Sequence, residues 1–202
     1  MSKQYFDVDK LLEEKPNARY YFLLSGRARG KTYGVLRRSA KDQNAGLGLF
    51  AYVRRYDEEI KTKNVQELFS PQNIDEITEG KYNKIAFWRG FFYFEKWEYD
   101  EEKGEVRRSY RNPDPCGVAL ALNTWERDKG KYISVDGFKH IIFDEVITGM
   151  NYLTNEFQTF QQVISSLVRD RYEKDTKIWF LANAAVDPGL LIYKILGSRK
   201  KK

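Results

Sequence analysis

Apolar and polar residues alternate along the chain in a way that predicts strands interleaved with helices. Short apolar runs bounded by glycine, proline or charge are typical of buried strands, whereas apolar residues three or four positions apart are typical of helices with one packed face. Strands are expected at residues 19–24, 47–53, 117–122, 139–143 and 177–181. Helices are expected from residue 31 to about 43, from 157 to 171, and, beginning at a proline, from 188 to 196. This order favours an α/β fold with a largely parallel sheet.

A different pattern occupies residues 85 to about 111, where aromatic side chains dominate. Residues 91–99 form an aromatic run, the charged residues 100–104 follow, and residues 106–110 lead back. Two such runs joined by a charged loop that contains glycine predict a β-hairpin inserted into the fold.

Composition narrows the chemistry. The 202-residue chain is 42% hydrophobic and suits a single domain with a real core. One cysteine, Cys116, excludes an intramolecular disulfide, and one histidine, His140, excludes a Cys/His zinc cluster. His140 also begins an apolar run, a poor place for an exposed catalytic base.

The remaining composition bears on location and partners. No apolar run reaches the roughly 18 residues of a membrane span, and the N-terminus is not signal-like, so we expect a soluble intracellular protein without a membrane partner. A formal charge of +6 only mildly favours a polyanionic partner. The side chains left for chemistry are Lys, Arg, Asp and Glu, which suit phosphate, nucleotide or nucleic-acid binding.

The loop after the first strand has the setting of a phosphate-binding loop. Its sequence is Ser25-Gly26-Arg27-Ala28-Arg29-Gly30-Lys31-Thr32, and it opens the first strong helix. The backbone N–H groups of such a loop and the positive end of the helix dipole bind phosphate oxygens. Lys31 would then contact the β- and γ-phosphates of ATP, and the Thr32 hydroxyl would ligate Mg²⁺. Ser25 replaces the usual first glycine, and a basic turn before a helix is the alternative.

Two acidic residues end the strand at 139–143. Asp144 and Glu145 would lie at the C-terminal edge of the sheet, where open α/β sheets bind ligands. There Asp144 would hold Mg²⁺, and Glu145 would orient or deprotonate the water that attacks the γ-phosphate. Taken alone, the Asp144-Glu145 pair has a simpler explanation, a strand that runs into a polar loop. The two motifs in this order support a nucleotide-hydrolysing site more strongly than either alone.

Three further side chains are candidates for the same site. Asn183 follows the last expected strand and would hydrogen-bond the attacking water or the γ-phosphate, unless it is only a turn residue. One arginine at the end of the expected helix, Arg169 or Arg171, would act as an arginine finger on a neighbouring subunit, although the helix dipole by itself also favours cations there. Arg27 is a second arginine candidate, acting from within the loop.

Taken together, these pieces resemble the DNA-packaging motor ATPases of phi29-like tailed bacteriophages, relatives of the large terminases and of ring DNA translocases. The resemblance extends from about residue 20 to residue 190. It rests on segments 27–32, 52–56 (Tyr-Val-Arg-Arg-Tyr), 122–125 with Lys129, 142–145, 168–171 and 181–184. The segment 52–56 is the most family-specific of these, whereas the loop and the acid pair indicate only an NTPase.

The resemblance implies a P-loop NTPase fold of the additional-strand catalytic-glutamate type, with a mainly parallel sheet, helices on both faces and an inserted hairpin. It implies an Mg²⁺-dependent ATPase in which Glu145 is catalytic, Arg169 and Lys129 act in trans, Arg27 acts in cis, and Asn183 is the sensor. The implied assembly is a ring, usually a pentamer, at the portal vertex of a procapsid in the host cytoplasm. That ring drives double-stranded DNA inward, in one branch together with a structural RNA.

Two departures accompany the resemblance. Ser25 and Ala28 replace loop glycines, and the hairpin is longer than the family minimum. We expect a motor domain over residues 1–196, a basic tail at 197–202, and no nuclease-like domain in this chain.

DNA contact is weakly marked in the sequence. Arg107, Arg108 and Arg111 on the return strand of the hairpin would meet a phosphate backbone, unless they form an ordinary solvated face. A terminase large subunit, a cellular ring translocase and a nucleotide-switched, non-hydrolysing nucleic-acid-binding module remain as alternative functions.

Overall fold

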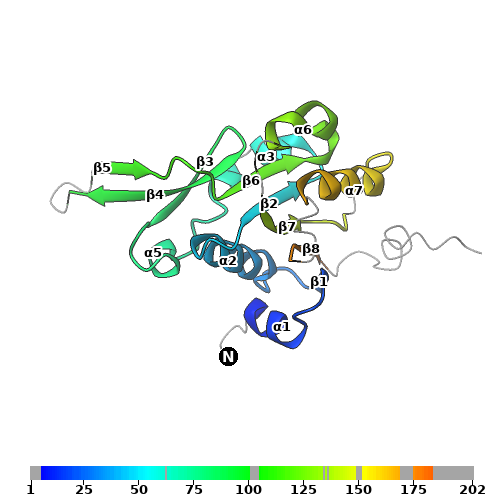
Figure 1. Ribbon diagram of the computed structural model, residues 1–202, viewed down its shortest axis with the longest axis horizontal. Coiled ribbons are helices and arrows are strands. Elements are labelled where there is room, and N and C mark those ends of the chain that lie inside the picture. Colours follow the sequence, from blue (N-terminus) through cyan, green and yellow to red (C-terminus); the bar gives the residue numbers. More distant parts are fainter. Residues whose placement is uncertain are drawn as a thin grey trace, which may run out of the picture.

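Eight strands form one mixed sheet at the centre of the fold, in the order β1-β8-β7-β2-β6-β4-β3, with β5 paired to β4 (Figure 1). The computed structural model describes residues 6–61, 63–100, 105–133, 135, 137–148, 152–168 and 175–183. Five neighbouring strands are parallel: β1 (Tyr20–Ser25), β8 (Lys177–Asn183), β7 (Phe138–Phe143), β2 (Leu49–Arg54) and β6 (Gly117–Ala121). The α/β class with a mostly parallel central sheet is therefore confirmed.

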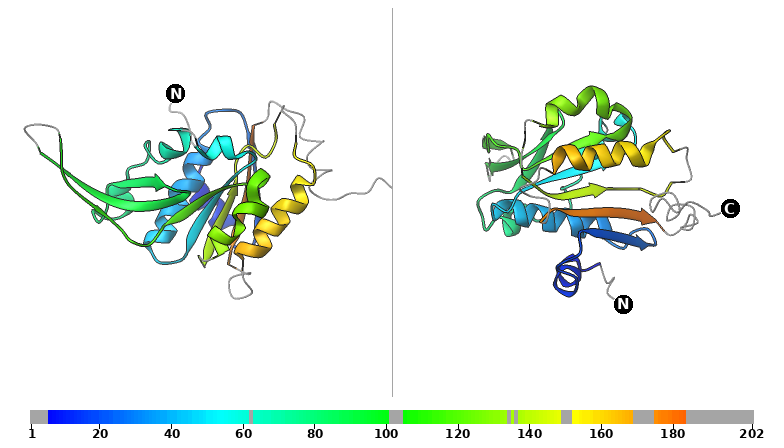
Figure 2. Two further views of the ribbon diagram at one scale, coloured as in Figure 1. Left: turned by 90° about the horizontal axis from the view of Figure 1, so that it is seen from above. Right: turned by 45° about the vertical axis from the view of Figure 1, so that its right-hand side comes forward.

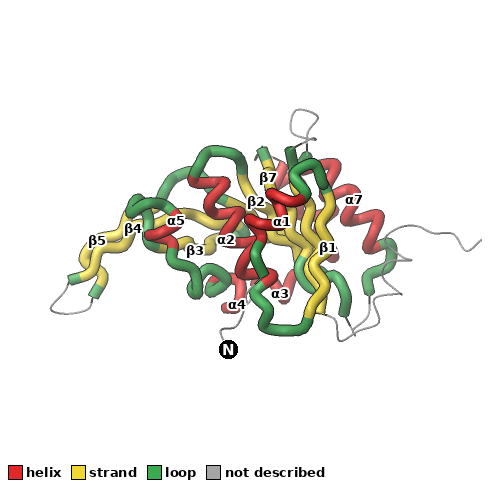
Figure 3. The backbone as a smooth tube through the Cα atoms, turned by 90° about the horizontal axis from the view of Figure 1, so that it is seen from below, coloured by secondary structure: helices red, strands yellow, loops and turns green. Residues whose placement is uncertain are grey.

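Helices cover both faces of the parallel strands, and each face has its own apolar core (Figure 2). On one face lie α1 (Val8–Glu14), α2 (Lys31–Asn44) and α5 (Ile74–Ile77), which Figure 3 shows from below. On the other face lie α6 (Trp125–Ile133) and α7 (Glu156–Leu167). Strand residues alternate between the two cores, so that Ile142 faces α2 whereas Ile141 and Phe143 face α7.

Three antiparallel strands extend the sheet at one side: β3 (Lys84–Trp88), β4 (Phe91–Tyr99) and β5 (Val106–Arg111). The start of β4 pairs with β6, and its far end pairs with β5 in a hairpin that projects from the body (Figure 1). Every residue of β5 is exposed. The long hairpin follows the aromatic pattern of the sequence.

A buried polar cluster lies inside the core beneath α2. His140 of β7 is 1% exposed, and its Nε2 lies 2.7 Å from Oδ2 of Asp42 in α2. Its Nδ1 accepts a hydrogen bond of 3.0 Å from the indole nitrogen of Trp179. Asp42 also pairs with Arg38, one turn earlier in α2, at 2.9 Å. The only histidine of the chain is therefore part of the core, as its place in an apolar run predicts.

Some expected elements differ from the structure. α7 ends at Leu167 and Val168 is extended, so the expected helix end at Arg171 is wrong. The backbone of Val168 leaves the helical region, with φ −98° and ψ 97°, although its side chain stays buried beside Leu167. Arg169, Arg171 and the helix expected at 188–196 lie outside the described residues, as does the expected basic tail.

Several short elements have no clear signal in the pattern. These are α1, α3 (Asp57–Lys61), α4 (Lys63–Gln66), the 3-10 turn at Leu122–Thr124 and α6. α6 is difficult to recognise because more than half of its residues are charged, and Trp125 and Tyr132 supply its buried contacts. In the described part of the chain, no helix has the length and apolar character needed to cross a bilayer.

Candidate active site

The loop between β1 and α2 has a backbone that few side chains tolerate. Gly30, immediately before α2, has a φ of 76°, and Ala28 has a φ of 57°, both in the left-handed region that favours glycine. The backbone N–H of Phe6 donates to the carbonyl of Arg29 at 3.0 Å and so ties the N-terminal segment to the loop. Among the described residues no side chain caps α2 and no acid lies in its first turn. The N-terminal end of α2 therefore retains its partial positive charge, which favours the binding of an anion.

Lys31 folds back over this loop. Its ammonium donates to the carbonyl and the hydroxyl of Ser25, each at 3.0 Å, and to the carbonyl of Gly26 at 3.1 Å. It also lies 3.4 Å from Oδ1 of Asn183, because Asn183 and Ser25 are direct partners at the ends of β8 and β1. Burial lowers the pKa of Lys31, and the charge of Asp144 opposes that effect. The ammonium is thus held between the loop and the end of β8.

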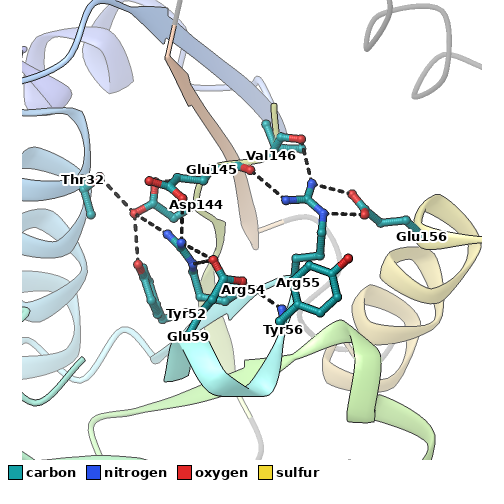
Figure 4. Close-up of polar contacts among 10 residues, drawn as sticks. All are labelled: Thr32, Tyr52, Arg54, Arg55, Tyr56, Glu59, Asp144, Glu145, Val146 and Glu156. Carbon is teal, nitrogen blue, oxygen red and sulfur yellow. Dashed lines mark hydrogen bonds and ion pairs between the residues drawn. The ribbon is translucent and has the colours of Figure 1, made fainter. Parts of the chain in front are cut away.

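Asp144 lies at the centre of the polar contacts (Figure 4). Its Oδ2 accepts hydrogen bonds from the Thr32 hydroxyl at 3.1 Å and from the Tyr52 hydroxyl at 3.0 Å. Arg54 lies 3.9 Å from the same oxygen. Burial raises the pKa of Asp144, and the charge of Arg54 and the hydrogen bond from Tyr52 work against that rise. A nearly buried carboxylate beside a threonine hydroxyl is a donor set suited to Mg²⁺.

Glu145 is placed differently from its neighbour. Its φ of 54° is unusual for a residue with a side chain, and that side chain is 52% exposed. One carboxylate oxygen accepts a 2.7 Å hydrogen bond from Arg54, which also pairs with Glu59 of α3 (Figure 4). Arg54 therefore lies between the two carboxylates that follow β7 and a third from α3.

Lys31, Thr32, Asp144 and Glu145 line one cavity of about 250 Å³. Its lining comprises residues 28–33, Asp144, Glu145 and residues 181–183. A more apolar cavity of about 340 Å³ lies beneath the start of α7, and Glu156 is the charged residue in its lining. The residues suited to phosphate and Mg²⁺ therefore meet in the loop cavity, and their chemistry fits a bound Mg²⁺-nucleotide.

Comparison with known proteins identifies the fold. No protein-family model and no curated protein sequence matches the chain. Its structure superimposes on the N-terminal domain of the DNA packaging ATPase from bacteriophage phi29 with a TM-score of 0.69 and 20% identity, covering 95% of this chain and 86% of that one. The chain has the fold of a phage packaging ATPase.

Two larger packaging motors share this packaging-ATPase fold. The Phi-28 gp11 DNA packaging motor matches with a TM-score of 0.68 and 19% identity over 98% of this chain. The bacteriophage phi29 genome packaging motor assembly matches with a TM-score of 0.64 and 20% identity over 95% of this chain. The chain spans 55% and 51% of the lengths of these two motor proteins.

Within the packaging-ATPase fold, the predicted site residues fall into two groups. Ala28 to Thr32, Asp144, Glu145 and Asn183 line the cavity, and Ser25 and Gly26 contact Lys31. The exposed Arg27 does not contribute to the cavity lining. Lys129 pairs with Glu126 at 2.8 Å and lines a polar groove between α6 and α7.

The three arginines of the hairpin do not form one cluster. Arg108 pairs across the sheet with Glu98, and Arg111 with Glu95, so they point to opposite faces, whereas Arg107 lies at an irregularity of the pairing. Arg111 also donates to the Glu95 carboxylate at 2.6 Å, which offsets its charge.

Three residues of the site carry no assigned role in the sequence analysis: Tyr52, Arg54 and Glu59. Tyr52 and Arg54 belong to the Tyr-Val-Arg-Arg-Tyr segment, where they are two apart and so share one face of β2. β2 lies beside β7, with Val53 paired to Phe143, and this register brings both side chains to Asp144. The alternation was visible in the sequence, but the pairing of these two strands was not.

Proposed function

We propose that this chain is the ATP-hydrolysing motor domain of a phage packaging ring that moves double-stranded DNA into a preformed capsid. The observation that carries the proposal is the strand order β1-β8-β7, which brings Lys31, Thr32, Asp144 and Asn183 to one cavity. The shared fold with phi29 packaging ATPases gives this site its proposed setting.

The same strand order supports the finer fold type. β8 is an additional strand between β1, which leads into the loop, and β7, which ends in the acid pair. Together with a glutamate directly after Asp144, this arrangement is what the additional-strand catalytic-glutamate type requires. Because these strands are parallel, their C-terminal ends lie at the same edge of the sheet, and the functional side chains lie at or just after these ends.

In the proposed reaction the loop 25–32 binds the phosphates of ATP and Lys31 neutralises part of their charge. Thr32 and Asp144 would hold Mg²⁺, which when bound offsets the phosphate charge. Glu145 orients the attacking water and accepts its proton, and Asn183 hydrogen-bonds the water or the γ-phosphate. Arg54 donates to one oxygen of the Glu145 carboxylate at 2.7 Å, which leaves the second oxygen to accept the proton.

The proposed assembly is a homo-oligomeric ring, a pentamer by its resemblance to the phi29 motors, docked on the portal in the host cytoplasm, with a structural RNA as a further partner. In such a ring Arg169 and Lys129 complete the site of the next subunit, and Arg27 acts within its own. The groove position of Lys129, away from its own cavity, is compatible with an action on a neighbour.

ATP turnover tests the enzymatic part. Steady-state phosphate release is measured over a range of protein concentrations for the wild type, Glu145→Gln and Arg169→Ala, with the exposed Glu67→Gln as a matched control. We expect activity that rises with concentration and is lost in both site variants but not in the control. Mixing the two inactive variants should restore part of the activity, because Glu145 and Arg169 then meet across an interface.

The outcomes separate the alternatives. Nucleotide binding without turnover in the wild type would point to a switch module. Full activity in a dilute monomer would refute the action of Arg169 in trans.

DNA contact is tested by the salt dependence of binding. Each phosphate neutralised by a cation contributes about −0.9 to the slope of log K against log salt for B-DNA. Neutralising Arg107, Arg108 and Arg111 together should flatten this slope for duplex DNA. Because Glu95 already offsets Arg111, Arg107 and Arg108 should account for most of the change. An unchanged slope would reject this hairpin as the contact.

A further inference from the structure

Arg55 is a buried guanidinium that no step of the proposed reaction uses. It follows β2 directly, is 4% exposed, and points away from Arg54 toward the start of α7 (Figure 4). Two of its nitrogens donate to the Glu156 carboxylate, at 2.6 and 2.8 Å. It also donates to the backbone carbonyl of Glu145 at 3.2 Å and to that of Val146 at 3.0 Å. One side chain therefore joins three elements: β2, the segment after β7, and α7.

The surroundings of this ion pair are nearly dry. The guanidinium lies 4.9 Å from the Tyr152 ring centroid and 5.6 Å from that of Phe143. The Glu156 side chain is 11% exposed, and it also accepts a hydrogen bond of 3.1 Å from the backbone N–H of Leu153. Buried ion pairs contribute little net stability compared with apolar residues of similar volume. Stability alone is thus a weak reason for this pair, and its geometry suggests another role.

That geometry bears on how Glu145 is held. Its left-handed backbone is strained for a residue with a Cβ, so the surrounding contacts have to maintain it. The N–H of Glu145 donates to Asp144 at 3.0 Å, and the N–H of Val146 donates to the carbonyl of Leu181 at 3.0 Å. Arg55 supplies the matching contacts on the carbonyl side. The direction in which the half-exposed Glu145 side chain leaves the backbone therefore depends on Arg55.

We propose that Arg55 is the positioning residue of Glu145, and that Glu156 makes this positioning depend on the place of α7. The effect of this positioning on turnover rests on the proposed function, in which Glu145 is the catalytic carboxylate. Arg55 does not line the cavity and does not contact the residues expected to bind phosphate, so it acts through the backbone carbonyls of Glu145 and Val146. Glu156 is the first residue of α7. A shift of that helix end would therefore move Arg55 through the bidentate ion pair between Glu156 and Arg55.

Arg55→Lys and Glu156→Gln test the proposal in the full chain. Lysine keeps the charge, but it cannot reach both carboxylate oxygens and two carbonyls at once. We expect kcat of Arg55→Lys to fall by about 10- to 100-fold, the size of effect that a misplacement near 1 Å produces. The affinity for a fluorescent ATP analogue should stay within about threefold, because Lys31 and Thr32 are unchanged. Glu156→Gln keeps the carbonyl contacts of Arg55 and should lower kcat less.

A second readout does not depend on activity. In Arg55→Lys, amide hydrogen exchange should accelerate at residues 145–147, while α2 keeps the wild-type protection. Arg127→Lys, an exposed arginine paired with Asp128, is the matched control and should change neither measurement. If the wild type does not hydrolyse ATP, the proposed function fails, but the exchange data still decide the positioning role.

Two results would overturn the proposal. In one, Arg55→Lys keeps wild-type kcat and wild-type exchange at residues 145–147. In the other, nucleotide binding, turnover and thermal stability fall in proportion, which would assign Arg55 a purely structural role. If Arg55→Lys does not fold, kcat and amide exchange at residues 145–147 are measured in Glu156→Gln instead. Wild-type values of both would reject the link to α7.

Discussion

Replacing His140 by leucine should destabilise the fold by removing the partner of two buried groups. The Trp179 indole N–H would lose its acceptor, which costs about 1–3 kcal/mol for a buried donor left unsatisfied. Asp42 would lose one donor and keep Arg38 at 2.9 Å, a loss of about 1.5–3 kcal/mol for a hydrogen bond to a charged group. Together these give about 2.5–6 kcal/mol, a large part of the roughly 5–15 kcal/mol that stabilises a typical domain.

The pH dependence follows from the same contacts. An indole nitrogen only donates, so Nδ1 of His140 is the acceptor and Nε2 carries the proton that Asp42 accepts. Burial lowers the pKa of His140, against the opposing effect of Asp42. As pH falls below about 6.5, the unfolded chain takes up this proton before the native state does. The free energy of unfolding should therefore fall with decreasing pH, by at most about 1.4 kcal/mol per pH unit from this group.

Urea unfolding at about pH 7.5 and about pH 5.5 measures both effects for the wild type, His140→Leu and His140→Gln. Glutamine can accept and donate as the neutral imidazole does, so His140→Gln should keep more stability at the higher pH while losing this part of the pH dependence. Because the chain has one histidine, its NMR signal reports the imidazole directly and should not titrate near 6.5. A midpoint near 6.5 in the native state, or a leucine variant within about 1 kcal/mol of wild type, would refute the reasoning.

Three further changes have defined outcomes. Tyr52→Phe removes a hydrogen bond to the Asp144 carboxylate and so raises its pKa further, which should move the acidic limb of the ATPase pH profile to higher pH. Gly48→Ala should lower the free energy of unfolding in urea by about 2–4 kcal/mol, because the φ of Gly48 is 136° and an added Cβ would meet the backbone carbonyl of Gly137. Gly46→Ala is the control and should lower it less, because Gly46 has a φ of 73° but open space around it. Burial raises the pKa of the Cys116 thiol, so it should react with a thiol reagent only after unfolding in urea, and rapid reaction in the native state would contradict its burial.

The loop and the acid pair were predictable because each is contiguous in sequence. A strand followed by Gly30-Lys31-Thr32 and a helix carries its geometry locally, and so does an apolar strand that ends in Asp144-Glu145. Asn183 was predictable for a related reason, because it follows an apolar run that is easily recognised as a buried strand.

Arg54, Tyr52 and Arg55 were not predictable in the same way. Their contacts depend on the pairing of β2 with β7 and on the closeness of α7, which are 90 or more residues away along the chain. A one-residue shift of β2 would exchange the faces of Arg54 and Arg55, and no local pattern fixes that register. The end of α7 was misjudged because apolar spacing continues through Val168, although the backbone there is already extended.

The pairing of β1 with β8 has a consequence for how this protein folds as it is synthesised. Tyr20 and its partner Ile178 lie about 160 residues apart, which at about 5–20 residues per second corresponds to roughly 8–30 s of translation. During that interval the strand before the loop lacks its neighbour in the sheet, and closing so long a segment carries an entropic cost. Lys31 also lacks its contact with Asn183 until the ribosome has passed β8. The sheet edge that carries the proposed nucleotide site is therefore complete only after almost all of the described chain has been synthesised.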